Sequence, residues 1–270
     1  MFILRAVPVS TNLLRHAPAW TLLLALVSGC SSRPPNPRTP DVVFLVPGAA
    51  GDGRHYDGLV RGLRAGGVED RVEVVPWGMP GPLSVLNLQD DGIHRRAEAK
   101  LAAELRAWRE RHPEARVSVV AHSAGCGVTL GALALPGTPS VDRVVLLNPS
   151  VSPGYDLTPA LPKIDQRLHV FHSDGDRFFL SWRTGTFGTY DNVKTRAAGN
   201  VGFTRVEKLP PVLNQKVTQH GRNETWRAQG NNGGHFGTCA RVFAAQTIAP
   251  LLESRAAFSE RNAIPASQTN

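Results

Sequence analysis

The chain of 270 residues is 41% hydrophobic and 19% charged, which gives one domain enough apolar material for a sizeable core. Outside its N-terminus no apolar run is long enough to cross a bilayer as a helix, which excludes a polytopic membrane protein. The formal net charge is +8, yet no dense cluster of lysine and arginine and no nucleic-acid-binding motif is present. We therefore expect no nucleic-acid partner and a solvated basic surface, with an anionic lipid surface or acidic polymers as alternative partners.

The first 29 residues are typical of an export signal, because Arg5, Arg15 and no acidic residue accompany an apolar stretch at 17–27. The stretch ends in Val-Ser-Gly-Cys at 27–30, which resembles the bacterial lipobox, where a peptidase cleaves before a lipidated cysteine. The resemblance implies an exported lipoprotein, anchored in a bacterial membrane through Cys30, with its folded domain in the periplasm or outside the cell. An ordinary cleaved signal peptide and an uncleaved membrane anchor are the alternatives, and inner or outer membrane stays open.

Repeated prolines follow at 30–40, where they fix φ and remove backbone donors. This stretch is expected to form an extended tether. The folded domain should cover 41–252, without an internal repeat or a second core, and a C-terminal tail should follow at 253–270.

Segments typical of strands and helices alternate along the domain. The expected strands lie at 41–46, 72–75, 116–121, 141–147 and 168–172, and the expected helices at 56–65, 93–111, 123–135 and 239–252. Continuous apolar runs, such as the one between Pro40 and Pro47, are typical of strands that are buried on both faces. The alternation predicts an α/β fold with a mostly parallel sheet and helices on both faces.

A serine lies where the third expected strand meets the next helix. The sequence Ala121-His-Ser123-Ala-Gly125 places it in the strand–turn–helix context that a nucleophile elbow requires. Such a turn strains the serine backbone, so small residues are needed two positions before and after it, and Ala121 and Gly125 are small. On these residues the chain resembles the α/β-hydrolase family of serine hydrolases, whose motif is Gly-x-Ser-x-Gly. Ala121 departs from the first glycine of that motif.

Two backbone N–H groups are expected to stabilise an oxyanion. The helix N-terminus behind the serine offers the N–H of Ala124. The resemblance implies a second donor from the glycine-rich loop at 47–53, which we assign by position to Ala49, with Ala50 next. The usual His-Gly of the family is Pro47-Gly in this chain. No Gly-Lys-Ser/Thr follows to favour phosphate binding, and a turn without chemistry is the remaining alternative.

The resemblance also implies an acid and a histidine after the serine, in that chain order. The histidine takes the proton of the serine hydroxyl, and the carboxylate orients the imidazole. Asp176 matches the family spacing of the acid if Ser173 replaces a glycine, and Asp174 is the alternative. The expected base is His235, in the loop Gly-Gly-His-Phe-Gly before the last helix, and His220 is the alternative.

The remaining histidines and cysteines are assigned supporting roles. His122 should support the serine by packing, and surface or structural positions are expected for His55, His94, His112 and His169. No HExxH motif and no paired cysteine spacing appears, so we expect no metal and no cofactor. Cys126 and Cys239 follow Ser123 and His235 closely, so a disulfide between them and two buried free thiols are both open.

The chemistry that these residues predict is hydrolysis of a carboxylic ester or thioester by an esterase-like or lipase-like monomer. Its substrate would be a small-molecule or lipid ester, and residues 177–234 and 148–162 are expected to form a lid or pocket walls. An acyltransferase would use the same residues with another acceptor. A non-catalytic, lipid-anchored envelope protein that uses the fold as a binding module is the competing class.

Replacement of the lipobox cysteine tests the predicted anchor. The Cys30→Ala variant should move from the membrane fraction to the soluble fraction, because it has no site for lipidation. Fractionation of cells followed by immunoblotting measures the shift, and a variant that stays with the membrane contradicts lipidation.

Overall fold

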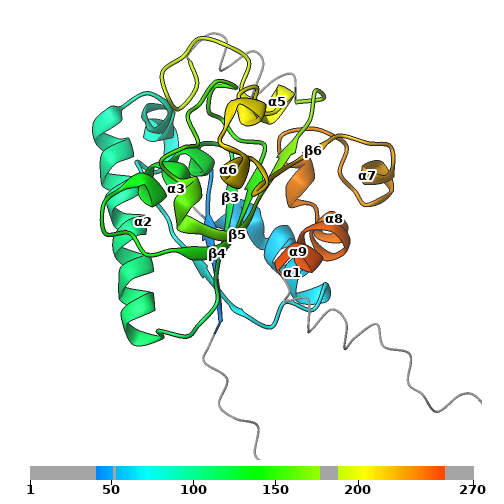
Figure 1. Cartoon of the computed structure of the whole chain (residues 1–270). Helices are drawn as coiled ribbons and strands as arrows, with labels where there is room; N and C mark the ends of the chain where they lie inside the picture. Colours follow the sequence, from blue (N-terminus) through cyan, green and yellow to red (C-terminus); the bar gives the residue numbers. More distant parts are fainter. Residues whose placement is uncertain (1–40, 51–52, 177–187, 253–270) are drawn as a thin grey trace, which may run out of the picture. The chain divides into compact units, whose positions relative to one another are not determined.

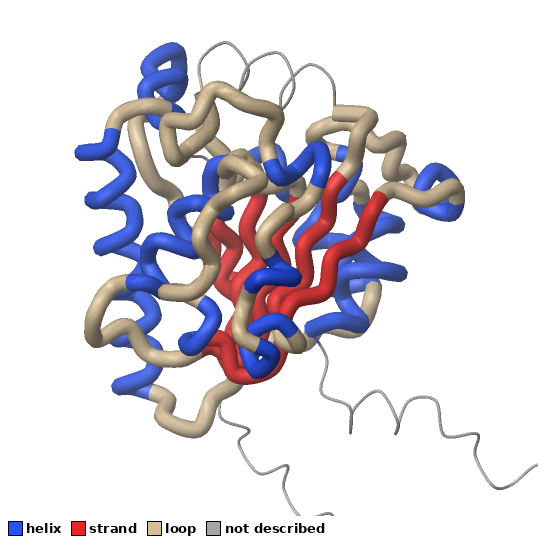
Figure 2. Tube along the Cα trace, turned by 45° about the horizontal axis from the view of Figure 1, so that its top comes forward, coloured by secondary structure: helices blue, strands red, loops and turns tan. Residues whose placement is uncertain are grey.

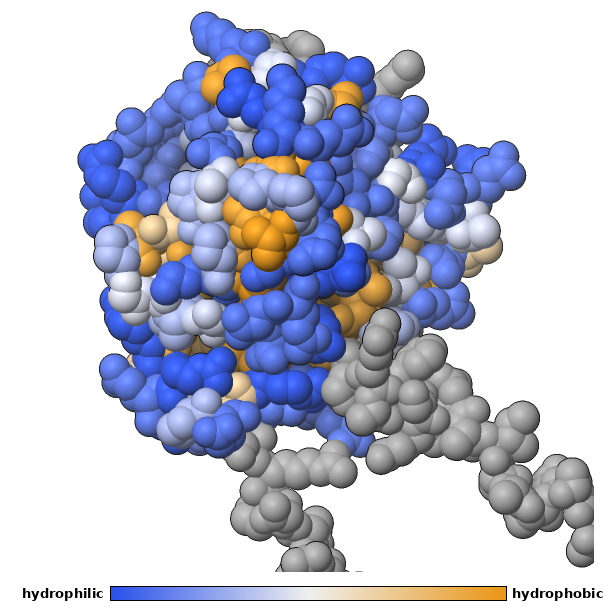
Figure 3. Space-filling view, in the orientation of Figure 1, coloured by the Kyte–Doolittle hydropathy of each residue, from blue (hydrophilic) through white to orange (hydrophobic). Residues whose placement is uncertain are grey.

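The computed structural model describes residues 41–50, 53–176 and 188–252, which lie in one compact unit. The expected signal segment, Cys30, the tether and the C-terminal tail lie outside the described residues. Among the described helices, none is both long enough and apolar enough to cross a membrane. The face drawn in Figure 3 is largely hydrophilic, and apolar side chains reach this surface in small patches.

Six strands form one sheet in the order β2-β1-β3-β4-β5-β6. The sheet is red in Figure 2. The strands are β1 (Val42–Val46), β2 (Arg71–Val74), β3 (Val117–His122), β4 (Val141–Leu147), β5 (Ile164–His172) and β6 (Val217–Gly221). Every neighbouring pair is parallel, so the carboxyl ends of all six strands lie along one edge of the sheet. The predicted α/β fold with a mostly parallel sheet is confirmed.

Helices cover both faces of the sheet, as expected (Figure 1). The longer ones are α1 (Asp57–Ala65), α2 (Asp91–Arg111) and α3 (Ala124–Ala134), and the last helical stretch comprises α8 (Arg241–Phe243), the π turn η7 (Ala244–Ile248) and α9 (Ala249–Leu252). Successive residues of β1 point to opposite faces. Phe44 joins the core under α2 and α3, and Leu45 joins the core under α1 and α8.

Short helical turns occupy the connections. They are η1 (Arg54–Tyr56), η2 (Gly81–Leu88), η3 (Leu161–Lys163), α5 (Ala198–Val201), η5 (Val206–Lys208), α6 (Pro211–Asn214), α7 (Thr225–Ala228) and η6 (Gly237–Cys239). Helix α2 starts two residues before its predicted start, because the Asp90 side chain accepts a hydrogen bond from the Ile93 N–H (2.7 Å) and caps the helix. The last helix starts at Arg241, because the extended Ala240 separates it from η6.

Strand β6 was not predicted. It lies within the stretch at 177–234 that was expected to form a lid or pocket wall, and part of that stretch, 177–187, lies outside the described residues. β6 is an edge strand of polar, partly exposed residues, so it lacks the apolar run that marks β1 or β3. Its residues therefore show no alternation of apolar and polar side chains that would predict a strand.

Two buried histidines have strongly lowered pKa values. His169 on β5 shares a hydrogen bond with His220 on β6 (Nδ1 to Nε2, 3.1 Å), and the His220 ring stacks on Phe171 with centroids 4.4 Å apart. Burial, with a smaller effect of His220, lowers the pKa of His169 to about 4. Burial lowers the pKa of His122, the last residue of β3, to about 3. Both imidazoles are therefore neutral at pH 7.

These pKa values make the free energy of unfolding depend on pH. The unfolded chain protonates its histidines near pH 6.5, whereas folded His122 and His169 stay neutral until the pH is much lower. Stability should therefore fall as the pH falls from 7 to 5, by about 2 kcal/mol for each of these two histidines. Urea denaturation at several pH values measures the loss. The His169→Phe variant should show a weaker dependence, and an unchanged slope would contradict the assignment.

Candidate active site

Ser123 occupies the turn between β3 and α3 in a backbone conformation that is rare for a residue with a side chain. Its φ is 54° and its ψ is −124°. Among the described residues, the other non-glycine positions with positive φ are Asn148 and Asn192. Such a conformation costs about 1–3 kcal/mol and persists only where its surroundings hold it. Here the Ser123 N–H donates to the Leu147 carbonyl (2.9 Å), and its carbonyl accepts from the Ser150 N–H (3.1 Å).

Gly125 lets α3 start directly against the loop that follows β1. A Cβ atom at this position would lie 2.5 Å from the carbonyl oxygen of Val46 and closer still to that of Pro47. Both obstacles are backbone atoms, so no side chain could swing away to make room. The sequence argument for a small residue after the serine therefore has a definite physical cause. At the other small position, Ala121 is fully buried, and the sheet accommodates its methyl group.

The loop after β1 lies against the serine and is held from outside. A Cβ atom on Gly48 would be 3.0 Å from the Ser123 Cβ. Three side chains from other elements hydrogen-bond to the backbone of three consecutive loop residues: Trp77 Nε1 donates to the Pro47 carbonyl (2.8 Å), the Gly48 N–H donates to Tyr56 Oη (2.7 Å), and Asn87 Nδ2 donates to the Ala49 carbonyl (2.7 Å). The loop is therefore fixed before any substrate arrives.

The three anchoring side chains were not identified from the sequence as parts of the site. Trp77 and Asn87 lie in segments without a motif, and Tyr56 was interpreted as the start of a helix. Asn87 is fully buried and also binds both the N–H and the carbonyl of Met79 (2.7 and 2.9 Å). An asparagine in a mostly apolar stretch is the one feature of the sequence that could have pointed to it.

His235 and Asp176 lie together and are nearly buried. The distance from His235 Nδ1 to Asp176 Oδ2 is 2.6 Å, and the two side chains are 8% and 1% exposed. Because the carboxylate accepts, the hydrogen of the neutral imidazole lies on Nδ1. Asp174, the alternative acid, is 76% exposed on its side chain and pairs with Arg222 at 3.6 Å. The structure therefore brings Asp176, and not Asp174, to this histidine.

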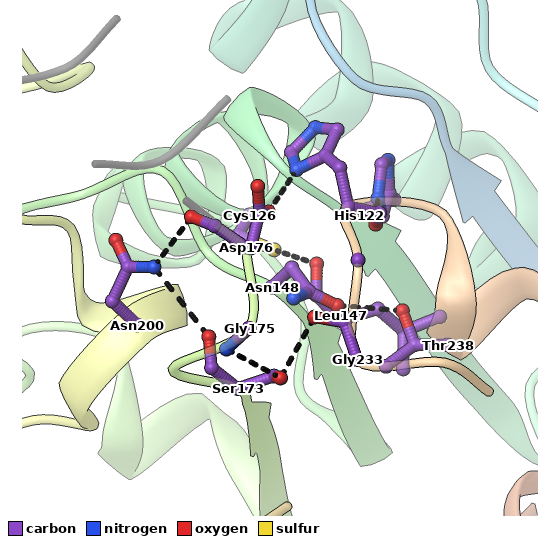
Figure 4. Close-up of polar contacts among 12 residues, drawn as sticks. His122, Cys126, Leu147, Asn148, Ser173, Gly175, Asp176, Asn200, Gly233 and Thr238 are labelled. Carbon is purple, nitrogen blue, oxygen red and sulfur yellow. Dashed lines mark hydrogen bonds and ion pairs between the residues drawn. The ribbon is translucent and has the colours of Figure 1, made fainter. Parts of the chain in front are cut away.

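Ser173 ties the turn that carries the acid to the loop that carries the histidine (Figure 4). Its Oγ donates to the Gly233 carbonyl (2.8 Å) and accepts from the Gly175 N–H (3.2 Å). Asn200 Nδ2 donates to the Asp176 carbonyl at 2.9 Å. The departure from the family glycine at position 173 thus provides a side chain that links the two segments.

His235 also reaches the serine turn, through a neighbour of the serine. His122 Nε2 lies 2.9 Å from the His235 carbonyl oxygen, and the two rings are 4.7 Å apart. In the described structure no direct hydrogen bond joins Ser123 to His235, and such bonds are often long before a substrate binds. His220, the alternative base, pairs with His169.

Cys126 and Cys239 are both buried free thiols, not the disulfide that the sequence left open. Burial raises the pKa of Cys239 to about 12 and that of Cys126 well above its usual value. Cys239 also contributes to the raised pKa of Cys126, so the two lie near each other. In the part of the chain that the structure describes, no group of three or more histidine, cysteine or acidic residues could hold a metal ion.

Two surface features lie on segments that contact the site through Ser150 and Asn87. The loop expected as a pocket wall at 148–162 lines a cavity of about 510 Å³ together with Asp191 and Arg205. On the side of η2, three apolar residues are exposed: Met79 (37%), Leu83 (52%) and Leu86 (44%). Asn87 of η2 holds the Ala49 carbonyl, so the element that carries Leu83 and Leu86 adjoins the loop after β1.

Neither a protein-family model nor a curated protein matches the sequence. The chain is similar to lipase B from Aspergillus fumigatus (TM-score 0.48, 15% identity, 79% of this chain and 52% of the lipase), so it spans about half of that protein. It is also similar to an esterase from Pyrococcus furiosus (TM-score 0.48, 15% identity, 82% of both chains). A third similar structure is a lipase-esterase related protein from Clostridium acetobutylicum (TM-score 0.47, 11% identity, 80% of this chain and 94% of that chain). Such distant likenesses carry no argument about activity, which rests on the geometry of the site.

The close approach at Gly125 can be tested by adding one methyl group. Gly125→Ala should lower the free energy of unfolding by about 1–3 kcal/mol, because backbone must move to admit the Cβ. Gly131→Ala, in the same helix, is the matched control, since the three atoms nearest to its Cβ all belong to the Glu98 side chain, which can move at the cost of its hydrogen bond to Tyr190. Urea denaturation compares the two variants, and equal stabilities would contradict the close approach.

Proposed function

We propose that the protein is a serine hydrolase of the α/β-hydrolase type that cleaves a carboxylic ester or thioester. The observation that carries the proposal is the strained Ser123 at the N-terminus of α3, next to His122, which hydrogen-bonds to the backbone of His235 in the buried Asp176–His235 pair. A protein keeps a side chain at positive φ when the surrounding structure or a function requires it. The position of this residue, directly after a buried parallel strand, is the one that exposes a nucleophile at the carboxyl edge of a sheet.

The proposed chemistry assigns one role to each of the three side chains. Ser123 Oγ attacks the ester carbonyl carbon while His235 Nε2 takes its proton. Asp176, bound to Nδ1, stabilises the imidazolium that forms. The tetrahedral intermediate collapses, His235 returns the proton to the departing alcohol or thiol, and an acyl-enzyme remains. Water, activated by the same histidine, then releases the acid.

The negative charge of the intermediate is stabilised by two backbone N–H groups, those of Ala124 and Ala49. Ala124 is the first residue of α3, where N–H groups have no partner within the helix. Ala49 belongs to the loop whose backbone three outside side chains hold. Donors that are fixed in advance do not need to reorganise in the transition state, which is the largest single contribution in many acyl-transfer enzymes.

An apolar acyl or alcohol group suits the surface beside this loop. Leu83 and Leu86 of η2, and Met79 just before it, expose apolar side chains, and Asn87 of η2 contacts the loop. Exposed apolar groups beside a reactive site favour substrates that remove them from water. This supports lipid or other apolar esters over charged ones.

A fluorophosphonate probe tests the nucleophile directly, because it phosphonylates an activated serine and needs no knowledge of the substrate. The wild-type protein should be labelled, and Ser123→Ala should not. A folded wild-type protein that resists the probe would sink the hydrolase proposal and favour a non-catalytic binding module.

The two aspartates provide the matched controls for this experiment. Asp176→Asn keeps the shape of the side chain but cannot stabilise an imidazolium, and should slow labelling by about 10³–10⁴-fold. Asp174→Asn removes an equal charge two residues away, on an exposed side chain, and should label at nearly the wild-type rate. Similar rates for these two variants would contradict the assignment of the acid.

A further inference from the structure

A buried chain of hydrogen bonds runs from the loop after β1 to the loop that carries His235. The Gly48 N–H donates to Tyr56 Oη (2.7 Å), Tyr56 Oη lies 2.8 Å from His122 Nδ1, and His122 Nε2 lies 2.9 Å from the His235 carbonyl oxygen. Tyr56 is 2% exposed and His122 is fully buried. Neither side chain takes part in the proton transfers proposed above, and Tyr56 has so far appeared as one of the three side chains that hold the loop after β1.

The direction of every bond in this chain is fixed. A carbonyl oxygen only accepts, so Nε2 of His122 carries the hydrogen that reaches His235. Nδ1 of the neutral ring is then an acceptor, and the Tyr56 hydroxyl must donate to it. The hydroxyl oxygen of Tyr56 in turn accepts from Gly48. Burial keeps the His122 ring neutral, because it lowers the pKa to about 3, so the pattern holds across the pH range in which enzymes work.

Aromatic packing holds the same residues in place. The Tyr56 and His122 rings meet edge to face with centroids 5.5 Å apart, and Phe236 stacks on His122 at 5.0 Å and 30°. Phe236 directly follows His235, so the base loop is attached to His122 by a hydrogen bond and by a ring contact. His122 therefore contacts the loop that carries His235 directly and the loop after β1 through Tyr56.

We infer that Tyr56 and His122 are positioning residues. They fix the loop after β1, which carries the proposed oxyanion donor, and the loop that carries His235, relative to Ser123. The inference rests on the proposed hydrolase function and adds two residues to it. His122 is the last residue of β3 and directly precedes the serine. Contacts with His122 therefore fix the position of both loops relative to Ser123. Tyr56 connects His122 to Gly48, the residue before the proposed donor Ala49, through its hydroxyl group.

Removal of the Tyr56 hydroxyl breaks two bonds at once. The Gly48 N–H and His122 Nδ1 would both lose their partner in a site that excludes water, so the loop must shift to find another. Misplacement of catalytic groups by a fraction of an ångström to one ångström costs about 10–100-fold in rate. The cost should fall on the chemical step, since the apolar surface beside η2 is untouched.

Steady-state hydrolysis of p-nitrophenyl acetate by the full protein tests this role. Tyr56→Phe should lower kcat by about 10–100-fold and leave KM within about twofold of wild type. Tyr190→Phe is the matched control, because Tyr190 is similarly buried. The variant loses one hydrogen bond, to Glu98 (2.9 Å), which does not belong to the series of bonds from Gly48 to His235. Tyr190→Phe should keep the wild-type kcat.

A double variant separates positioning from general destabilisation. His122→Asn can still accept from Tyr56 but is too short to reach the His235 carbonyl, so it should lower kcat independently of how well Tyr56→Phe folds. Because both residues act in one chain, the double variant should lose much less than the product of the two single losses. Multiplicative losses, or equal losses in Tyr56→Phe and Tyr190→Phe, would overturn the positioning role.

The outcomes also separate this inference from the function on which it rests. A wild-type protein that hydrolyses the ester and reacts with the fluorophosphonate probe, together with a Tyr56→Phe variant of wild-type kcat, overturns the inference alone. A wild-type protein inert in both assays overturns the proposed function.

Discussion

The missing side chain at Gly125 is the constraint on which the rest of the site depends. It allows the first turn of α3 to touch the backbone of the loop after β1, so the helix N-terminus, the loop and Ser123 share one small volume. The positive φ of Ser123 is the local strain of that arrangement, and hydrogen bonds with Leu147 and Ser150 hold it. Close packing at one residue thus creates the place where negative charge can be stabilised.

The fold could be predicted where burial leaves a mark on the sequence. β1 and β3 are buried on both faces and appear as continuous apolar runs, so the parallel sheet followed from them. The prediction was incomplete where strands are polar. β5 starts four residues before its predicted start. The prediction missed these residues because 165–167 are polar and exposed, and it missed the edge strand β6 for the same reason. Polarity that comes from an edge position cannot be distinguished locally from that of a loop.

In the candidate site, residues in short sequence patterns could be predicted, whereas residues that act through contacts made by the fold could not. Ser123, Asp176 and His235 lie in short patterns that a sequence displays, and the structure brings the last two together. Tyr56 and Trp77 act through contacts with backbone that is 8 and 30 residues away along the chain. Such contacts depend on where the fold places a side chain, and no spacing encodes them.

The hydrogen bond from Ser173 to the Gly233 carbonyl has a consequence for how the sequence can change. It joins two turns that are 60 residues apart, and Gly233 itself needs its positive φ of 83°. The turn that carries the acid and the loop that carries the histidine are therefore hydrogen-bonded to each other, while the serine lies between β3 and α3. Position 173 therefore needs a side chain that can donate to a carbonyl, whereas position 233 needs a residue that tolerates positive φ.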